Sequence, residues 1–213
     1  MAEERRADAN EPVLTAPWPP LALSGLLVAL FAVQGGWPLA QLALVPAHLS
    51  AAGGWTGLLT SLFVHGGWAH VLMNAAFLLA FGTPLARAFG THAGGALAFL
   101  LFYLLCGVLG GLGYVLLHPD SGAAVVGASG AVSGLLGATA RLMAPPGRLA
   151  PFLSPPVLGI TAATLIVNLL AAVLGTLPGA GGAGVAWEAH LAGYAAGLLL
   201  IGPAAALAWR MPR

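Results

Sequence analysis

The stretch VVGASGAVSG, residues 125–134, decides how the rest of the chain is interpreted. It places Ser129 among small residues and opens an apolar run that ends near Arg141. Such a run predicts a helix, with the Ser129 hydroxyl on its first turn. A Gly-x-Ser-Gly pattern arises easily by chance in a chain with 31 glycines, so its meaning depends on the segments around it.

The composition is that of an integral membrane protein. The chain of 213 residues is 59% hydrophobic and 6% charged, with a mean hydropathy of +0.94. Soluble domains carry about 25% charged residues, so this chain lacks the polar surface to cover a soluble globule. The net charge of +1 gives no reason to expect nucleic acid as a partner. The single cysteine, Cys106, lies in an apolar run and is expected to be a small buried residue.

Six apolar runs predict an all-α bundle of six transmembrane helices, because a spanning helix needs about 20 residues. They cover about 20–33 (with its end left open as far as 40), 68–87, 93–117, 127–143, 156–175 and 187–209. The fourth is short, which leaves room for water above Ser129. The connection 41–66 is expected at the membrane boundary. The charged tail 1–17 is expected to be disordered, and 18–210 to form one membrane domain.

The arginines predict the orientation of these helices. With the N-terminus in the cytoplasm, all seven fall on the cytoplasmic side, as the positive-inside rule requires. They are Arg5, Arg6, Arg87, Arg141, Arg148, Arg210 and Arg213. Both termini are therefore predicted in the cytoplasm. The starts of the second, fourth and sixth helices then lie together near the extracytoplasmic face.

Small residues predict which helices meet. Gly130, Gly134 and Gly137 recur on the fourth helix, Gly193 and Gly197 on the sixth, and Gly107 and Gly111 on the third. Small residues three or four apart allow close approach of helices in lipid. His190 shares a face with Gly193 and Gly197. If that face meets Gly130 and Gly134, His190 lies beside Ser129, although the same pattern is also compatible with packing alone.

Several polar residues near the predicted extracytoplasmic starts of these helices are of the types that acyl transfer needs. His70 and Asn74 are four residues apart, on one helical face, and could donate to an oxyanion. His190 could act as general base for Ser129. The alternative for His70 and Asn74 is hydrogen bonding that only joins helices. His65, at the membrane edge, is more simply explained as structural.

Apart from a serine–histidine pair, the known ways of cleaving a peptide bond within a membrane need residues that this sequence does not contain. There is no lysine for a Ser-Lys dyad, and the only aspartates, Asp8 and Asp120, lie outside the predicted spans. No His-Glu-x-x-His motif is present for zinc, so no metal site is predicted. Glu188 falls roughly on the opposite side of the helix from His190. A Ser129–His190 dyad without an acidic third member is therefore the prediction.

Three segments resemble the rhomboid family of intramembrane serine proteases. They are TSLFVHGGWAHVLMN (60–74), GASG (127–130) and AHLAG (189–193), in the family's order and spacing from about residue 45 to 200. The resemblance implies that Ser129 is the nucleophile and His190 the base. It implies an oxyanion hole of His70, Asn74 and the Ser129 backbone N–H.

The resemblance also implies the surroundings of that site. The supporting residues would be His65, Gly127, Gly130 and Gly193. The connection 41–66 would be a membrane-embedded first loop, and the fifth helix with loop 176–186 a substrate gate and cap. The substrates implied are single-span membrane proteins in the bilayer, cut near the extracytoplasmic side of the inner membrane, with no cofactor. The oligomeric state is not predicted.

The chain departs from the usual family pattern at three positions. Trp55-Thr56 replaces Trp-Arg, Ser133 replaces a tyrosine after the nucleophile, and Ala86 replaces an acidic residue. Two alternatives are left open by the sequence. One is an inactive rhomboid-like protein that binds single-span clients, which an intact Ser129 and His190 argue against. The other is a small-solute or metal transporter, which the lack of membrane carboxylates and of inverted repeats argues against.

Overall fold

The computed structural model describes residues 16–49, 54–175 and 184–208, and these fold into helices joined by short turns. The helices are α1 (Trp18–Val33), α2 (Leu39–Leu42), α3 (Gly57–Thr60), α4 (Trp68–Phe89), α5 (Ala93–Leu117), α6 (Ser129–Leu142), α7 (Pro155–Leu174) and α8 (Trp187–Ala208). Within the described ranges, the β-type pairing is a single bridge between Leu44 and Val125.

The helices that correspond to the six predicted spans begin and end close to their predicted bounds. The open question at the end of the first one is settled, because α1 stops at Val33 and passes through a 3-10 turn, Gln34–Gly36. Pro38 is then the N-cap of the short helix α2, which begins at Leu39. The predicted tail 1–17, except its last two residues, and residues 176–183 of the predicted cap lie outside the described residues.

Five helices of the described chain are long and apolar enough to cross a membrane, which makes this a multi-pass membrane protein. They are α1 with its 3-10 extension, α4, α5, α7 and α8. The sixth predicted span, α6, has 14 residues, a rise of about 21 Å against a hydrocarbon core of about 30 Å. A crossing count of six and the cytoplasmic N-terminus stay predictions.

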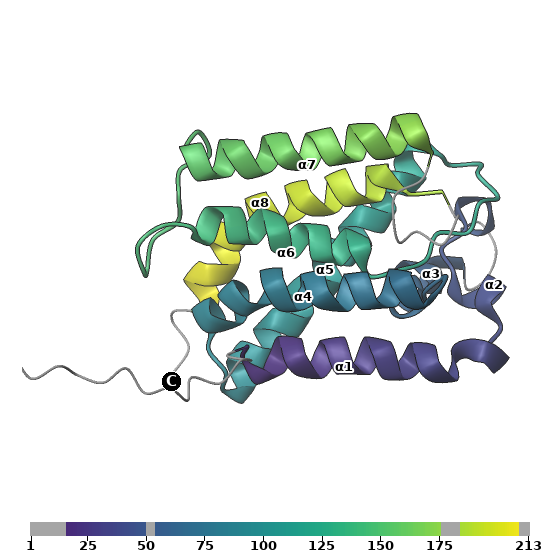
Figure 1. The fold of residues 1–213 in the computed structure, drawn as a ribbon, viewed down its shortest axis with the longest axis horizontal. Coiled ribbons are helices and arrows are strands. Elements are labelled where there is room, and N and C mark those ends of the chain that lie inside the picture. The colour runs from purple at the N-terminus through teal and green to yellow at the C-terminus, as the bar shows by residue number, and fades with distance from the viewer. Residues whose placement is uncertain (1–15, 50–53, 176–183, 209–213) are drawn as a thin grey trace, which may run out of the picture.

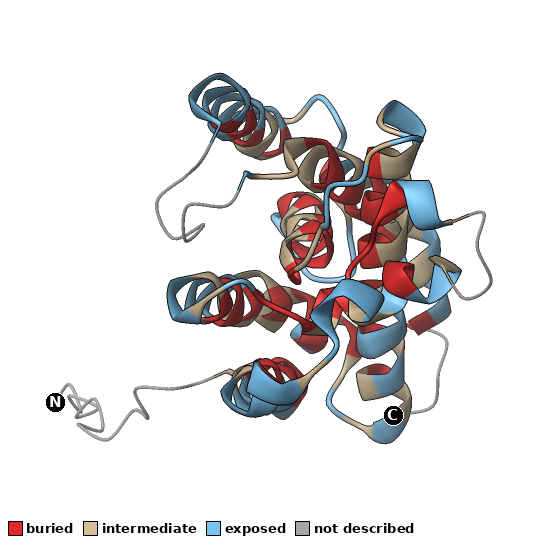
Figure 2. Cartoon of the chain, turned by 90° about the vertical axis from the view of Figure 1, so that its right-hand side faces the viewer, coloured by how far each residue is buried: buried red, intermediate tan, exposed pale blue. Residues whose placement is uncertain are grey.

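The short helix α6 lies at the centre of the bundle. It packs against α4, α5, α7 and α8, and eight of its 14 residues are buried. Figure 1 shows α7 and α1 at opposite edges of the molecule, with α5 crossing behind the others at an angle. In the view of Figure 2, buried residues gather toward the middle and exposed ones cover the outer faces. An apolar outer surface is expected where lipid, rather than water, is the solvent.

The predicted small-residue contact between α6 and α8 is confirmed. A Cβ on Gly193 would overlap the carbonyl oxygen of Gly130, and one on Gly197 would overlap that of Gly134. The same part of α6 also approaches α5, since a Cβ on Gly134 would overlap Cys106. The backbones of α6 and α8 therefore touch, which only glycine permits at these positions.

The segment between α1 and α4, which contains α2 and α3, packs against α5. Leu44 and Leu58 lie against Gly111 of α5, and Leu62 lies against Gly107. All three leucines are buried. The two glycines that the sequence placed on the third helix thus receive the first loop, and Gly107 also faces Ala131 of α6.

Candidate active site

The N-terminal ends of α4, α6 and α8 lie at one end of the molecule, to the right in Figure 1. His70, Ser129 and His190 are in the first turns of these three helices. Arg87 and Arg141 are in the last turns of α4 and α6, at the other end. The predicted separation of polar site and positive charge along the helices is therefore present in the fold.

Ser129 is the first residue of α6, and the preceding segment is fixed by hydrogen bonds to the first loop. Leu44 and Val125 exchange backbone hydrogen bonds of 3.0 and 2.8 Å, and the Gly127 N–H donates to the Ser61 carbonyl at 2.9 Å. The Ala128 N–H faces Nε2 of His65 at 3.4 Å. These contacts fix where α6 begins and so where the serine hydroxyl lies.

Gly127 is required by its conformation and by its neighbour. Its φ is +114°, a region that side chains disfavour, and an added Cβ would lie 2.6 Å from Nε2 of His70. The chain can pass this close to the imidazole only because Gly127 has no side chain.

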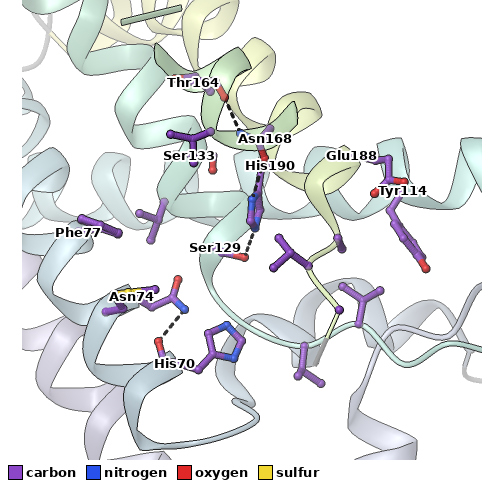
Figure 3. Close-up of a pocket in the computed structure, with 18 of the residues that line it drawn as sticks. His70, Asn74, Phe77, Tyr114, Ser129, Ser133, Thr164, Asn168, Glu188 and His190 are labelled. Carbon is purple, nitrogen blue, oxygen red and sulfur yellow. Dashed lines mark hydrogen bonds between the residues drawn. The ribbon is translucent and has the colours of Figure 1, made fainter. Parts of the chain in front are cut away.

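Ser129 and His190 are in direct contact. The Ser129 Oγ lies 2.7 Å from Nε2 of His190, and both side chains are partly buried. Figure 3 shows the imidazole pointing from α8 toward the hydroxyl. This is the arrangement in which a neutral histidine can accept a hydroxyl proton.

The other ring nitrogen of His190 has a partner that the sequence analysis missed. Nδ1 lies 3.1 Å from Oδ1 of Asn168, a buried residue of α7. The signal for Asn168 was present, since it is a strongly polar side chain in the apolar run 155–174, and such residues in membrane helices are seldom without a role. Glu188, which the sequence analysis placed roughly on the opposite side of the helix from His190, contacts His118 at the C-terminal end of α5, with Oε1 and Nε2 2.7 Å apart.

His70 and Asn74 face the same space from α4. The Gly66 N–H donates to Nδ1 of His70 at 3.4 Å, so in the neutral ring the proton is on Nε2. Asn74 is buried and donates from Nδ2 to the His70 carbonyl at 3.0 Å. The same amide nitrogen has a second hydrogen. Figure 3 shows both side chains across the cavity from His190.

His65 supports the site rather than lining its cavity. It is buried, and its backbone N–H and carbonyl are both bonded by the side chain of Gln34, at 3.0 and 2.6 Å. Burial, with a smaller contribution from His70, lowers the pKa of His65 to about 3. The ring is therefore neutral, and the Gln34–His65–Ala128 chain ties the end of α1 to the start of α6. Gln34 was also missed by the sequence analysis, which left the end of the first span open as far as residue 40.

A cavity of about 750 Å³ lies between α4, α6, α7 and α8. Ser129, His190, His70, Asn74 and Asn168 all contribute to its wall. Ser133, which stands where the family usually has a tyrosine, lines it as well. Most of the remaining wall is apolar, which suits an extended peptide segment with apolar side chains. In the described ranges, no three His, Cys, Asp or Glu side chains come together as metal ligands do.

Comparison with known proteins identifies the family of this chain. The family model of the rhomboid domain matches residues 52–205. The chain is 34% identical over 122 residues to "Rhomboid protease GluP" of Bacillus subtilis (strain 168), covering 55% of this chain and 22% of that protein. It is 36% identical over 87 residues to "Putative rhomboid protease YdcA" of the same organism, covering 41% of each.

A plant protein is similar as well. The chain is 37% identical over 81 residues to "RHOMBOID-like protein 5" of Arabidopsis thaliana, covering 38% of this chain and 25% of that protein. The aligned part is thus less than half of each of these relatives. The family match extends from the first loop to α8 and contains all the residues of the cavity described above. This chain belongs to the rhomboid family.

Proposed function

We propose that this protein is an intramembrane serine endopeptidase that uses Ser129 as nucleophile and His190 as general base. The observation that carries the proposal is the 2.7 Å contact between Ser129 Oγ and His190 Nε2. It lies in a mostly apolar cavity with hydrogen-bond donors on the opposite wall. The proteases named among its relatives support the same reaction class.

In the first step, the Ser129 oxygen attacks the carbonyl carbon of the scissile peptide and its proton moves to Nε2 of His190. The imidazolium then donates this proton to the nitrogen of the leaving amine, the C–N bond breaks, and an acyl-enzyme remains. A water molecule, deprotonated by the same nitrogen, hydrolyses the ester and restores the serine hydroxyl. The reaction consumes one water and needs no metal or cofactor.

The negative charge that forms on the carbonyl oxygen would be stabilised by three donors. They are Nε2–H of His70, the second Nδ2 hydrogen of Asn74 and the backbone N–H of Ser129. The last belongs to the first turn of α6, where the helix dipole also favours negative charge. Gly127 makes the set possible by leaving space for the His70 ring.

The substrates we propose are single-span membrane proteins, cut near the extracytoplasmic side of the inner membrane. With 14 residues, α6 is too short to cross the hydrocarbon core, and a helix that begins below the membrane surface would hold the Ser129 hydroxyl inside the membrane. The cavity lies between α4 and α7, and α7 is the least buried of the long helices, with four buried residues among 20. A substrate segment arriving through lipid would therefore meet the hydroxyl inside the membrane, which supports α7 as the gate.

Reconstitution in liposomes tests the proposal. The protein is mixed with a single-span substrate that carries a small residue near its extracytoplasmic end, and the products are identified by mass. We expect two fragments whose masses sum to the substrate plus one water. An intact substrate that nevertheless co-purifies with the protein would contradict proteolysis and favour a client-binding role.

Removing either oxyanion donor should slow chemistry more than binding. For His70→Ala and for Asn74→Ala we expect kcat to fall by about 10²–10³-fold with little change in KM, since the donors act on charge that appears in the transition state. His48→Ala, at an exposed histidine, is the matched control and should leave both constants unchanged. Steady-state cleavage in liposomes measures these constants. A rise in KM at constant kcat would show that the two residues bind substrate instead.

A further inference from the structure

Among the described residues outside the proposed catalytic set, Asn168 contacts the base directly, through a hydrogen bond between its side chain and His190. It lies on α7, whereas Ser129 and His190 lie on α6 and α8. The residue is 5% exposed, and its side chain reaches the imidazole on the side away from Ser129. A primary amide in a membrane helix has two donors and one acceptor oxygen to satisfy, so its orientation is informative.

The orientation of the amide follows from its second contact. Nδ2 of Asn168 donates to the carbonyl oxygen of Thr164, one turn earlier in α7, at 2.9 Å. The reversed amide would place its oxygen against that carbonyl oxygen, two acceptors facing each other. The Thr164 carbonyl therefore assigns Oδ1 to the side of His190.

Once Oδ1 faces the ring, the tautomer of His190 follows. Oδ1 only accepts, so Nδ1 of His190, 3.1 Å away, must donate. In a neutral imidazole with the proton on Nδ1, Nε2 carries a free lone pair. That lone pair faces the Ser129 hydroxyl at 2.7 Å. The opposite tautomer would direct an N–H at the hydroxyl and could not accept its proton.

We propose that Asn168 is a positioning residue that holds His190 in the Nδ1-protonated tautomer, and so in the orientation in which Nε2 can act as base. This rests on the proposed function of Ser129 and His190. The proposal gives α7 a role in the chemistry, in addition to its place in the cavity wall. The base is then oriented by a neutral amide in place of the missing acidic residue.

A second link between α7 and α8 makes a clean control possible. The hydroxyl of Thr161 lies 2.7 Å from that of Tyr194, so α7 is attached to α8 away from His190. Thr161→Val removes this attachment and leaves Asn168 in place. Asn168→Leu removes the acceptor at nearly constant volume and leaves Thr161 in place. The two variants separate orientation of the base from attachment of the helix.

The rate of labelling by a small fluorophosphonate reports on Ser129 activation without the entry of a transmembrane segment. We expect Asn168→Leu to lower this rate and kcat for cleavage by about tenfold, the order of one hydrogen bond, with little change in KM. Asn168→Asp keeps an acceptor for Nδ1 but sets its second oxygen against the Thr164 carbonyl, so it should restore part of the lost rate. Thr161→Val should label at the wild-type rate. Thermal unfolding of each variant in detergent shows that it is folded.

The tautomer can also be read directly, whatever the activity. In protein labelled with 15N-histidine, and with the His190 signals identified by their loss in His190→Gln, we expect the shifts of a neutral ring protonated on Nδ1. Asn168→Leu should move them toward those of a tautomer mixture. Unchanged shifts, or equal labelling rates for wild type and Asn168→Leu, would overturn the inference alone. A wild-type protein that is neither labelled nor active would overturn the proposed function and this inference with it.

Discussion

Replacing Ser129 by alanine should reduce substrate cleavage to less than about one part in 10⁴ of the wild-type kcat, and replacing His190 by alanine should do nearly the same. The hydroxyl that contacts Nε2 of His190 is that of Ser129, whereas Ser133, also in the cavity wall, is one turn further along α6. The measurement is kcat for a single-span substrate in liposomes. Ser133→Ala is the matched control and should retain cleavage.

The double variant gives the sharper form of this test. If Ser129 and His190 act as one unit, removing both should cost no more than removing either, because each single loss already removes the whole reaction path. Multiplying effects, with a double variant far slower than both single ones, would show that the two residues act independently. That result would contradict the mechanism.

The second large effect is expected where α6 meets α8. Gly197→Ala should lower the free energy of unfolding by about 1–3 kcal/mol or more, because the new methyl group overlaps the backbone carbonyl of Gly134 and the two helices must move apart. The same movement separates the helices that carry Ser129 and His190, so kcat should fall as well. Thermal unfolding and cleavage, measured on the same preparation, test both parts.

Gly202→Ala provides the control on the same helix. A Cβ at Gly202 would have Leu149 as its nearest neighbour at 3.9 Å, an ordinary contact. We expect this variant to match or slightly exceed wild type in stability, because alanine favours the helix over glycine by about 1 kcal/mol in peptide models. If Gly197→Ala behaved like Gly202→Ala, the close contact of the α6 and α8 backbones would be wrong.

Much of the helix order and of the contact between α6 and α8 could be predicted from the sequence. Long apolar runs determine where helices form in lipid, since backbone groups there must be satisfied within the segment. The spacing of Gly193 and Gly197 relative to His190 predicted the face on which His190 meets α6. These signals are local and periodic, and a single sequence contains them.

The supporting contacts could not be predicted in the same way. Asn168 reaches His190 across 22 positions of the chain, and Gln34 reaches His65 across 31. The local pattern around either residue does not indicate its partner, because the pairing depends on how α1 and α7 pack against the other helices and the first loop. The segment 125–128 likewise depends on Leu44, Ser61 and His65, which come from a loop of short turns without a helical period.

The most direct test of the account is to find which atom becomes covalently modified. Purified protein is treated with a fluorophosphonate, digested, and the adduct located by mass spectrometry, for the wild type and for Ser129→Ala and His190→Ala. The account predicts one phosphonyl group on Ser129 in the wild type, none in Ser129→Ala and a strongly reduced amount in His190→Ala. An adduct on another residue, or one of equal amount in Ser129→Ala, would contradict the assignment of Ser129 as the nucleophile.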